Sequence, residues 1–152
     1  LCKNWNTELV CEDGRVRLLV DSKSPEDEIR TAETSAVVSN VAAVPFVRDW
    51  MRAQQRESVR FGNLVMEGRD IGSNIFPETE FKFYIDASLE ERQARRAADG
   101  VQENLAARDQ RDSSRKASPL VVPEGATVIN NSGETPEETS GRIIAEIERK
   151  LR

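Results

Sequence analysis

Histidine is absent from this chain of 152 residues. Any catalysis would therefore use carboxylates, arginines, lysines or a metal, because the side chain that most often serves as acid and base is missing. Cysteine is scarce, and Cys2 and Cys11 fit neither a metal-ligand spacing nor a disulfide framework. The chain also lacks apolar stretches long enough to span a membrane, and its start, Leu1 to Leu9, is too polar for a signal peptide. We therefore expect a cytoplasmic protein whose thiols are buried or idle.

The composition is that of one globular domain. Hydrophobic residues make up 38% of the chain and charged residues 32%, which is typical of a folded protein. The formal net charge of −5 argues against nucleic acid as a partner. The first residue is Leu1 rather than Met, which leaves open a fragment, a processed product or an incomplete gene model.

The first third of the chain predicts an α+β segment. Asp13-Gly14 suits a tight hairpin turn, because glycine accepts positive φ, and strand-like runs flank it. Small apolar residues then predict a helix, and Pro45 breaks it or opens a second one. The expected elements are strands at Thr7–Val10 and Arg15–Val20, and helices at Ala32–Val44 and from there to about Val59.

From about residue 60 onward, strands alternate with helices, which predicts a parallel sheet covered by helices. We expect Leu64–Met66 to be a strand buried on both faces, because it is a short apolar run bounded by glycines. The other expected strands are Phe81–Asp86 and Ala126–Ile129, and the expected helices are Leu89 to about Ala98, Glu103 to about Arg115, and one that starts at Thr135.

Two of these helices have local start signals. Ser88 caps the helix at Leu89, and Glu91 completes a capping box. Thr135 caps the last helix, with Pro136 at its first position. The predicted buried stripe of that last helix consists of Ile143, Ile147 and Leu151, with Ile144 beside them.

The polar loop Glu67–Gly72 follows the strand expected at Leu64–Met66. In parallel α/β sheets, ligands bind just past the carboxyl ends of strands. Arg69 and Asp70 lie between two glycines that let the backbone approach a ligand closely. The alternative is a solvated turn whose charges pair with each other, and we favour the ligand site.

Arginines are dense between Arg92 and Lys116. Their planar forks match phosphate oxygens, which suggests a ligand with several negative charges. A helix pair linked by surface ion pairs, each worth only about 0.3–0.5 kcal/mol, explains the same residues equally well. Together with Arg69 and Asp70, phosphate binding is favoured.

Four blocks in a fixed order carry a family resemblance. They are Ser39 to Arg48 (SNVAAVPFVR), Glu67 to Gly72 (EGRDIG) followed by Phe76-Pro77, Phe83 to Ser88 (FYIDAS), and Arg108 to Arg115 (RDQRDSSR) with Pro119-Leu120. Their order and spacing resemble those of the bacterial cytidylate kinases over nearly the whole chain.

The resemblance implies an α/β fold of the P-loop nucleoside monophosphate kinase type, with a parallel sheet flanked by helices. The expected parts are an α+β NMP-binding insertion (1–60), the core (61–88 and 117–152) and a short Arg-rich lid (89–116). The implied reaction is transfer of the γ-phosphoryl group of ATP, with Mg²⁺, to CMP or dCMP.

The resemblance also implies roles for single residues. The cytosine would be read by Ser39, Arg48 and Asp70. Arg69 would hold the α-phosphate, Arg108 and Asp112 would contact the sugar, and Arg115 would lie between sugar, base and phosphate. Lid residues facing the ATP phosphates would be Arg92, Arg95 and Arg96. The catalytic residues would be Arg69, Arg108 and Arg115, and no protein ligand for the metal is identified.

Elementary chemistry agrees with the assignment at the base. Cytosine presents an amino donor beside two acceptors, so Asp70 would accept while Ser39 and Arg48 donate. Uracil has an oxygen in place of the amino group and would leave buried groups unpaired, which discriminates by about 10⁴ or more. Phosphoryl transfer requires positioning and charge neutralisation, which suits a site without histidine.

The family's phosphate-binding motif, Gly-x-x-x-x-Gly-Lys-Ser/Thr, is not found, because lysine follows none of the eight glycines. We expect a kinase whose N-terminal strand and P-loop lie outside this chain, and a chain that alone transfers phosphate poorly or not at all. A non-catalytic CMP-binding or scaffold protein that has lost its P-loop is the alternative, and a separate chain that supplies the P-loop is a third. We expect a monomer whose partners are nucleotides, not nucleic acid or membranes.

Overall fold

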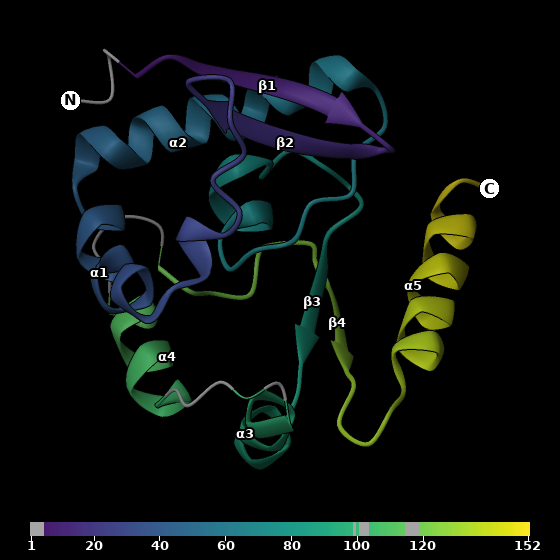
Figure 1. Cartoon of the computed structure of the whole chain (residues 1–152). Helices are drawn as coiled ribbons and strands as arrows, with labels where there is room; N and C mark the ends of the chain where they lie inside the picture. The colour runs from purple at the N-terminus through teal and green to yellow at the C-terminus, as the bar shows by residue number, and fades with distance from the viewer. Residues whose placement is uncertain (1–4, 99, 101–103, 115–118) are drawn as a thin grey trace. The chain divides into compact units, whose positions relative to one another are not determined.

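The computed structural model describes residues 5–98, 100, 104–114 and 119–152, apart from the side chains at positions 30, 32, 35 and 39. The chain divides into two compact units, Leu1–Glu67 and Gly68–Arg152. Figure 1 shows a hairpin and helices in the first unit, and a parallel strand pair with helices in the second.

The first unit begins with the predicted hairpin. Strand β1 (Thr7–Glu12) pairs antiparallel with β2 (Arg15–Val20), and Glu12 lies opposite Arg15. Asp13 and Gly14 have φ values of 50° and 70°, as a type I′ turn requires at both of its central positions. The hairpin is therefore confirmed, and β1 is two residues longer than its apolar pattern indicated.

Two helices follow, as predicted, after the short 3₁₀ turn Glu28–Arg30. Helix α1 (Ala32–Ala42) ends two residues earlier than expected, and Pro45 is the first residue of α2 (Pro45–Glu57), which continues as the 3₁₀ turn Ser58–Phe61. Proline fits that position because the first helical N–H has no partner within the helix. The aromatic rings of Trp5 and Trp50 meet edge to face, with 5.5 Å between their centroids.

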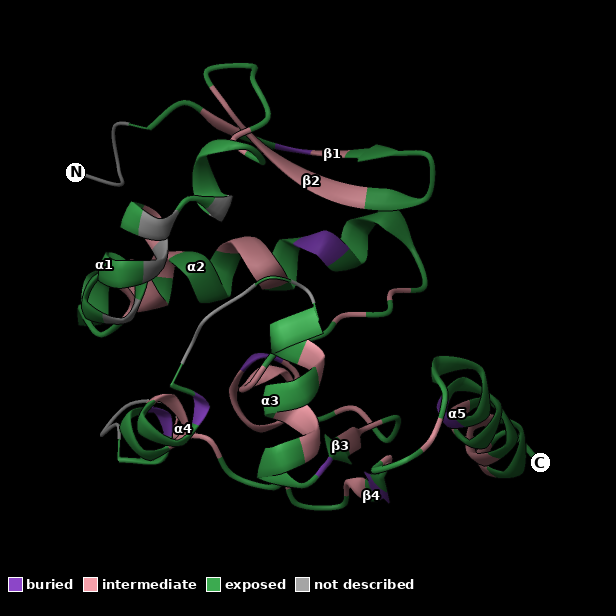
Figure 2. Ribbon diagram, turned by 60° about the horizontal axis from the view of Figure 1, so that its bottom comes forward, coloured by how far each residue is buried: buried purple, intermediate pink, exposed green. Residues whose placement is uncertain are grey.

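The second unit is organised around two parallel strands, β3 (Phe83–Asp86) and β4 (Thr127–Asn130). Phe83 pairs with Thr127 and Asp86 with Asn130. The apolar residues most deeply buried in this unit are Ile75, Ala87, Leu105 and Ile129. Figure 2 colours the buried stretches of the ribbon purple. The predicted parallel α/β arrangement is confirmed, although β3 begins two residues after the expected Phe81.

Helices α3 (Leu89–Ala98), α4 (Leu105–Ser113) and α5 (Pro136–Lys150) complete the second unit. At α5 the hydroxyl of Thr135 accepts from the Glu138 N–H and the Glu138 carboxylate accepts from the Thr135 N–H, so the predicted cap is confirmed as a full capping box. At α3 only half of the expected box forms. Ser88 Oγ accepts from the Glu91 N–H at 3.2 Å, but the Ser88 N–H donates to Ser132 Oγ instead.

The strand expected at Leu64–Met66 is wrong. These residues form no strand, and the Val65 side chain is 100% exposed. A strand requires a neighbour that satisfies its backbone N–H and C=O groups. Within the described residues the two sheets consist of β1 with β2 and β3 with β4, so this apolar run has no ladder partner there.

The buried stripe expected on the last helix is also wrong. Ile143 and Ile147 are half-buried, while Ile144 and Leu151 are 56% and 71% exposed. The four-residue strand β4 spans roughly 13 Å, whereas the fifteen-residue helix α5 is roughly 22 Å long. A two-stranded sheet of that size is too short to cover the whole apolar face of the helix.

Candidate functional site

The loop that carries Arg69 and Asp70 leads directly into a π-helical turn, Ile71–Ile75. The Asp70 carbonyl accepts hydrogen bonds from the N–H groups of Asn74 and Ile75, at 2.9 and 3.2 Å. Turns of this kind are rare and are often found at functional sites. The sequence predicts a plain loop here, because no side-chain period signals a single π turn.

The two glycines that flank this loop are packed against their own unit. A Cβ atom at Gly68 would lie 2.8 Å from Ile71 Cγ1, and one at Gly72 would lie 3.1 Å from Pro123 Cγ. The sequence predicts that these glycines leave room for a ligand. In the structure, neighbouring side chains take up that space, and glycine is needed for close packing.

Arg69 lies at the centre of a group of charged side chains, which we call the arginine–aspartate cluster: Arg69, Arg92, Arg108, Asp109 and Asp112. Nη1 of Arg69 donates to Asp109 Oδ1 and to Asp112 Oδ2, each at 2.7 Å. Nη1 of Arg92 donates to the other oxygen of Asp109, Oδ2, at 2.5 Å. Nε of Arg108 lies 3.8 Å from Asp112 Oδ2.

Three elements bring the cluster together. Arg69 comes from the loop before the π turn, Arg92 from α3, and the remaining three residues from α4. Asn104 caps α4 by accepting from the Ala107 N–H, and the spacing of three residues puts Asp109 and Asp112 on one face of that helix. Nε of Arg92 also donates to the Ala87 carbonyl at 3.1 Å, and this bond fixes the Arg92 side chain on α3.

The two carboxylates of the cluster differ in burial. The side chain of Asp112 is 3% exposed and that of Asp109 24%, whereas Arg69 is 31% exposed. Burial raises the pKa of Asp109, but the hydrogen bonds from Arg92 and Arg69 outweigh it, so the pKa lies below its ordinary value. The cluster therefore holds the ionised carboxylate of Asp109 against guanidinium groups that still reach solvent.

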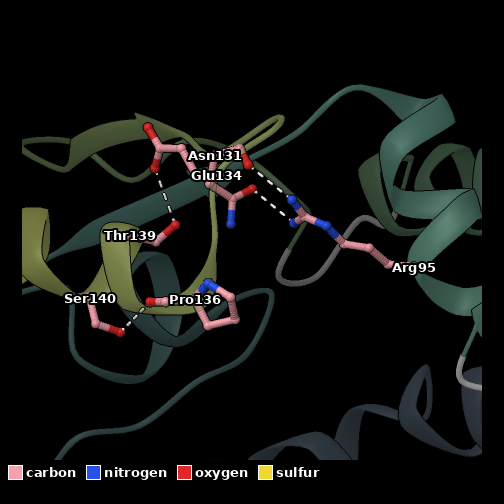
Figure 3. A pocket seen from close by; sticks show the side chains of 6 residues that line it. All are labelled: Arg95, Asn131, Glu134, Pro136, Thr139 and Ser140. Atoms are coloured by element: carbon pink, nitrogen blue, oxygen red, sulfur yellow. Dashed lines mark hydrogen bonds between the residues drawn. The ribbon is translucent and has the colours of Figure 1, made fainter.

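Arg95 lies at a second place in this unit, beside the carboxyl end of β4. Its Nη1 donates to Asn131 Oδ1 at 3.1 Å and its Nη2 to the Asn131 carbonyl at 2.9 Å (Figure 3). The cavity next to this contact measures about 330 Å³, and its lining residues are Arg95, Asn131, Glu134, Pro136, Thr139 and Ser140. Arg96 is exposed and forms no ion pair within the described part of the chain.

The predicted site residues fall into three groups. The structure brings Arg69, Arg92, Arg108 and Asp112 together, and Asp70 directly follows Arg69 in the chain. Arg48 lies in the first unit, where its Nε donates to the Ala42 carbonyl at 3.2 Å. Ser39 lies on α1 but its side chain is not among those described, and Arg115 is outside the described residues altogether.

Asp109 is the residue of the cluster that sequence reasoning did not single out. The signal was available, because Asp109 stands three residues before Asp112 on a predicted helix dense in arginine. Its role became visible only when Arg69 and Arg92, which are distant in sequence, were both found on its carboxylate.

Residues that could hold a metal do not gather in the described residues, where no three histidine, cysteine or acidic side chains form a suitable group. Among these residues there is also no helix long and apolar enough to cross a membrane.

Known proteins resemble this chain over most of its length. The sequence profile of the family described as cytidylate kinase matches residues 2–149. The chain belongs to the cytidylate kinase family. Its members are nucleoside monophosphate kinases, and the family implies ATP and a divalent metal as participants in the reaction.

Individual cytidylate kinases match over most of the chain. The cytidylate kinase of Caldanaerobacter subterraneus subsp. tengcongensis is 38% identical, covering 92% of this chain and 67% of the relative. The cytidylate kinase of Symbiobacterium thermophilum is 38% identical, covering 87% of this chain and 63% of the relative. The bifunctional pantoate ligase/cytidylate kinase of Synechococcus sp. is 39% identical, covering 84% of this chain and 27% of the relative. The chain thus spans about two thirds of the length of the first two relatives.

Proposed function

We propose that this chain takes part in cytidylate kinase catalysis, the transfer of the ATP γ-phosphoryl group to CMP or dCMP with Mg²⁺, in the cytoplasm and as a monomer. The observation that carries the proposal is the arginine–aspartate cluster beside the Gly-Arg-Asp loop. It gathers guanidinium groups from a loop and two helices around one place. Such an arrangement can bind the phosphate of a nucleotide through charge-assisted hydrogen bonds.

The proposed division of labour follows the residue types. Arg69 would hold the α-phosphate, Arg108 would contact the sugar, and Arg115 would lie between sugar, base and phosphate. As the catalytic residues, these three arginines would neutralise the charge that develops during transfer. Ser39, Arg48 and Asp70 would recognise the cytosine edge. Asp112 would contact the sugar, and in the structure its carboxylate binds Arg69. A buried carboxylate in that position also keeps the guanidinium oriented.

The lid arginines belong to the ATP side of the same proposal. Arg92 contributes to the cluster, while Arg95 borders the cavity next to β4. Arg96 is exposed and carries its charge into solvent. We propose that these three residues face the ATP phosphates during the reaction, with Arg95 and Arg96 nearest to the cavity side.

The test is a calorimetric titration of the full chain with CMP, UMP and cytidine. We expect CMP to bind at least about a hundredfold more tightly than UMP, because uracil leaves the polar groups of a cytosine site unpaired. Cytidine should bind more weakly than CMP, because it lacks the phosphate. Equal affinities for CMP and UMP would show that the chain does not recognise cytosine.

A further inference from the structure

Arg69 is held by one end of its guanidinium group. The hydrogen bonds of this side chain to Asp109 and to Asp112 both start from Nη1. An arginine carries five N–H donors, and these two bonds use the pair on Nη1. Within the residues that the structure describes, Nε and Nη2 of Arg69 make no hydrogen bond, and the side chain is 31% exposed.

The remaining donors lie on one edge of the guanidinium. Nε and Nη2 present parallel N–H groups, and such an edge binds two oxygens of a phosphate or carboxylate at once. Asp109 and Asp112 therefore fix the direction of Arg69 without using this edge. A ligand oxyanion can meet the Nε–Nη2 edge while both aspartates stay in place.

Arg92 is fixed by the same carboxylate. Its Nη1 donates to Asp109 Oδ2, and its Nε donates to the Ala87 carbonyl. Nη2 of Arg92 remains available in the described part of the chain, and the side chain is 33% exposed. One carboxylate thus sets the spacing between two guanidinium groups that come from a loop and from α3.

We propose that Asp109 is a positioning residue that orients Arg69 toward the phosphate of CMP through one carboxylate oxygen and holds Arg92 beside it through the other. The inference rests on the proposed function for the identity of the nucleotide, and on the cluster geometry for the role of Asp109. In the competing arrangement, the incoming phosphate displaces Asp109 from the arginines. The two arrangements predict opposite effects of removing the carboxylate.

The first experiment compares binding of CMP and of cytidine to four forms of the full chain by calorimetry. Asp109→Asn should weaken CMP binding by about tenfold or more, as the loss of a charge-assisted contact would. Cytidine binding should stay unchanged, because it has no phosphate. Asp109→Glu should recover most of the loss, because it restores the charge.

The matched control is Glu146→Gln. Glu146, on α5, likewise binds an arginine through both carboxylate oxygens, at 2.6 and 2.7 Å, and also accepts from Thr127 Oγ1, but none of these residues belongs to the cluster. This variant should bind CMP like the unmodified chain. Tighter or unchanged CMP binding by Asp109→Asn would overturn the proposal, and so would an equal loss for CMP and cytidine.

A second experiment needs no variant. The side-chain carboxyl signal of Asp109 is followed by NMR as a function of pH, without and with sulphate, which stays doubly charged in the acid range where Asp109 titrates. If Asp109 keeps its arginine partners, its pKa stays lowered when sulphate binds. Shifts of the Arg69 Nε–H signal show in the same samples that sulphate has bound. At saturating sulphate, a pKa of Asp109 at or above its ordinary value would show displacement and would overturn the proposal, because sulphate raises the pKa by repulsion but retained arginines lower it.

The two proposals fail in distinguishable ways. Equal binding of CMP and UMP, with a tenfold loss for both in Asp109→Asn, would refute the proposed function and support the positioning role. Selective CMP binding that Asp109→Asn leaves unchanged would refute the positioning role alone.

Discussion

Arg69 and Asp109, forty positions apart in the sequence, are joined by a 2.7 Å hydrogen bond between Nη1 and Oδ1. This contact connects the loop after Glu67 to helix α4, and the second oxygen of the same carboxylate extends the connection to α3. Because Asp109 binds both Arg69 and Arg92, the charged side chains of the cluster form one connected network. A change at either carboxylate should therefore affect more than one arginine.

Asp112→Ala should lower the free energy of unfolding by about 1–3 kcal/mol, because it removes the buried partner of Arg69. This loss is smaller than that usually found when one partner of a buried ion pair is removed. The reason is that Arg69 and Arg108 are about one third exposed, so water can solvate them. Urea denaturation followed by circular dichroism measures the effect. Glu148→Gln, at an exposed position of α5, serves as the control and should unfold like the unmodified chain, and an equal midpoint for both variants would contradict the prediction.

Acid should destabilise the protein through its carboxylates. The pKa of Asp109 is lowered by its arginines against the effect of burial, that of Glu138 by hydrogen bonds from Thr135, and that of Glu146 by Arg149. A lowered folded-state pKa means that the unfolded chain binds protons first, so stability is complete above about pH 5 and is lost below about pH 4.

Unfolding curves measured between neutral and acid pH test this dependence. Asp109→Asn should show a shallower acid loss than the unmodified chain, because one of the three groups no longer titrates. The charged groups next to Asp109 are Arg69 and Arg92, which bind its carboxylate. Asp112 and Arg108 lie near it on α4. An identical acid slope for the variant would mean that Asp109 contributes nothing to it.

Thr135→Ala should reduce stability by about 1 kcal/mol, because it opens the capping box at the start of α5. Ser140→Ala on the same helix is the control. Its hydroxyl donates only to the carbonyl of Pro136 within the helix, so its removal should be nearly neutral. Helicity and the urea midpoint are measured for both variants. A larger loss of stability in the Ser140 variant than in the Thr135 variant would contradict the prediction.

Asp70→Asn should shift the base preference from CMP toward UMP. The asparagine amide offers an N–H to the uracil oxygen, where the aspartate offers only acceptors. We expect CMP affinity to fall and UMP affinity to rise, so that the CMP/UMP ratio decreases by about tenfold or more. Glu67→Gln, an exposed carboxylate three residues earlier, is the matched control, and its ratio should be unchanged. A variant that loses affinity for both nucleotides equally would argue against base recognition by Asp70.

Features that depend on neighbours in the sequence were predictable. The turn at Asp13-Gly14 needs two positive φ values, and the start of α5 needs a threonine, a proline and a glutamate in fixed order, so a few residues determine each. Leu64–Met66 failed because an apolar run becomes a strand only beside another strand, and the run does not specify that neighbour.

The candidate site was predictable to a similar degree. Residue types and motif order pointed to Arg69, Arg92, Arg108 and Asp112, which the structure joins. The bond pattern within this group could not be read from the sequence. Which nitrogen of Arg69 is used depends on side-chain conformations and on where α4 lies relative to the loop, and both are set by packing.

The tryptophans and the tyrosine divide between the two units in a way that gives each unit its own spectroscopic signal. Both tryptophans of the chain lie in the first unit, in edge-to-face contact, while the only tyrosine, Tyr84, lies on β3 of the second. Tryptophan emission thus reports on the hairpin and its helices, and a fluorine label on Tyr84 reports on the parallel strands. Unfolding of the two halves can be recorded separately in one unmutated sample, and the order in which they lose structure becomes directly observable.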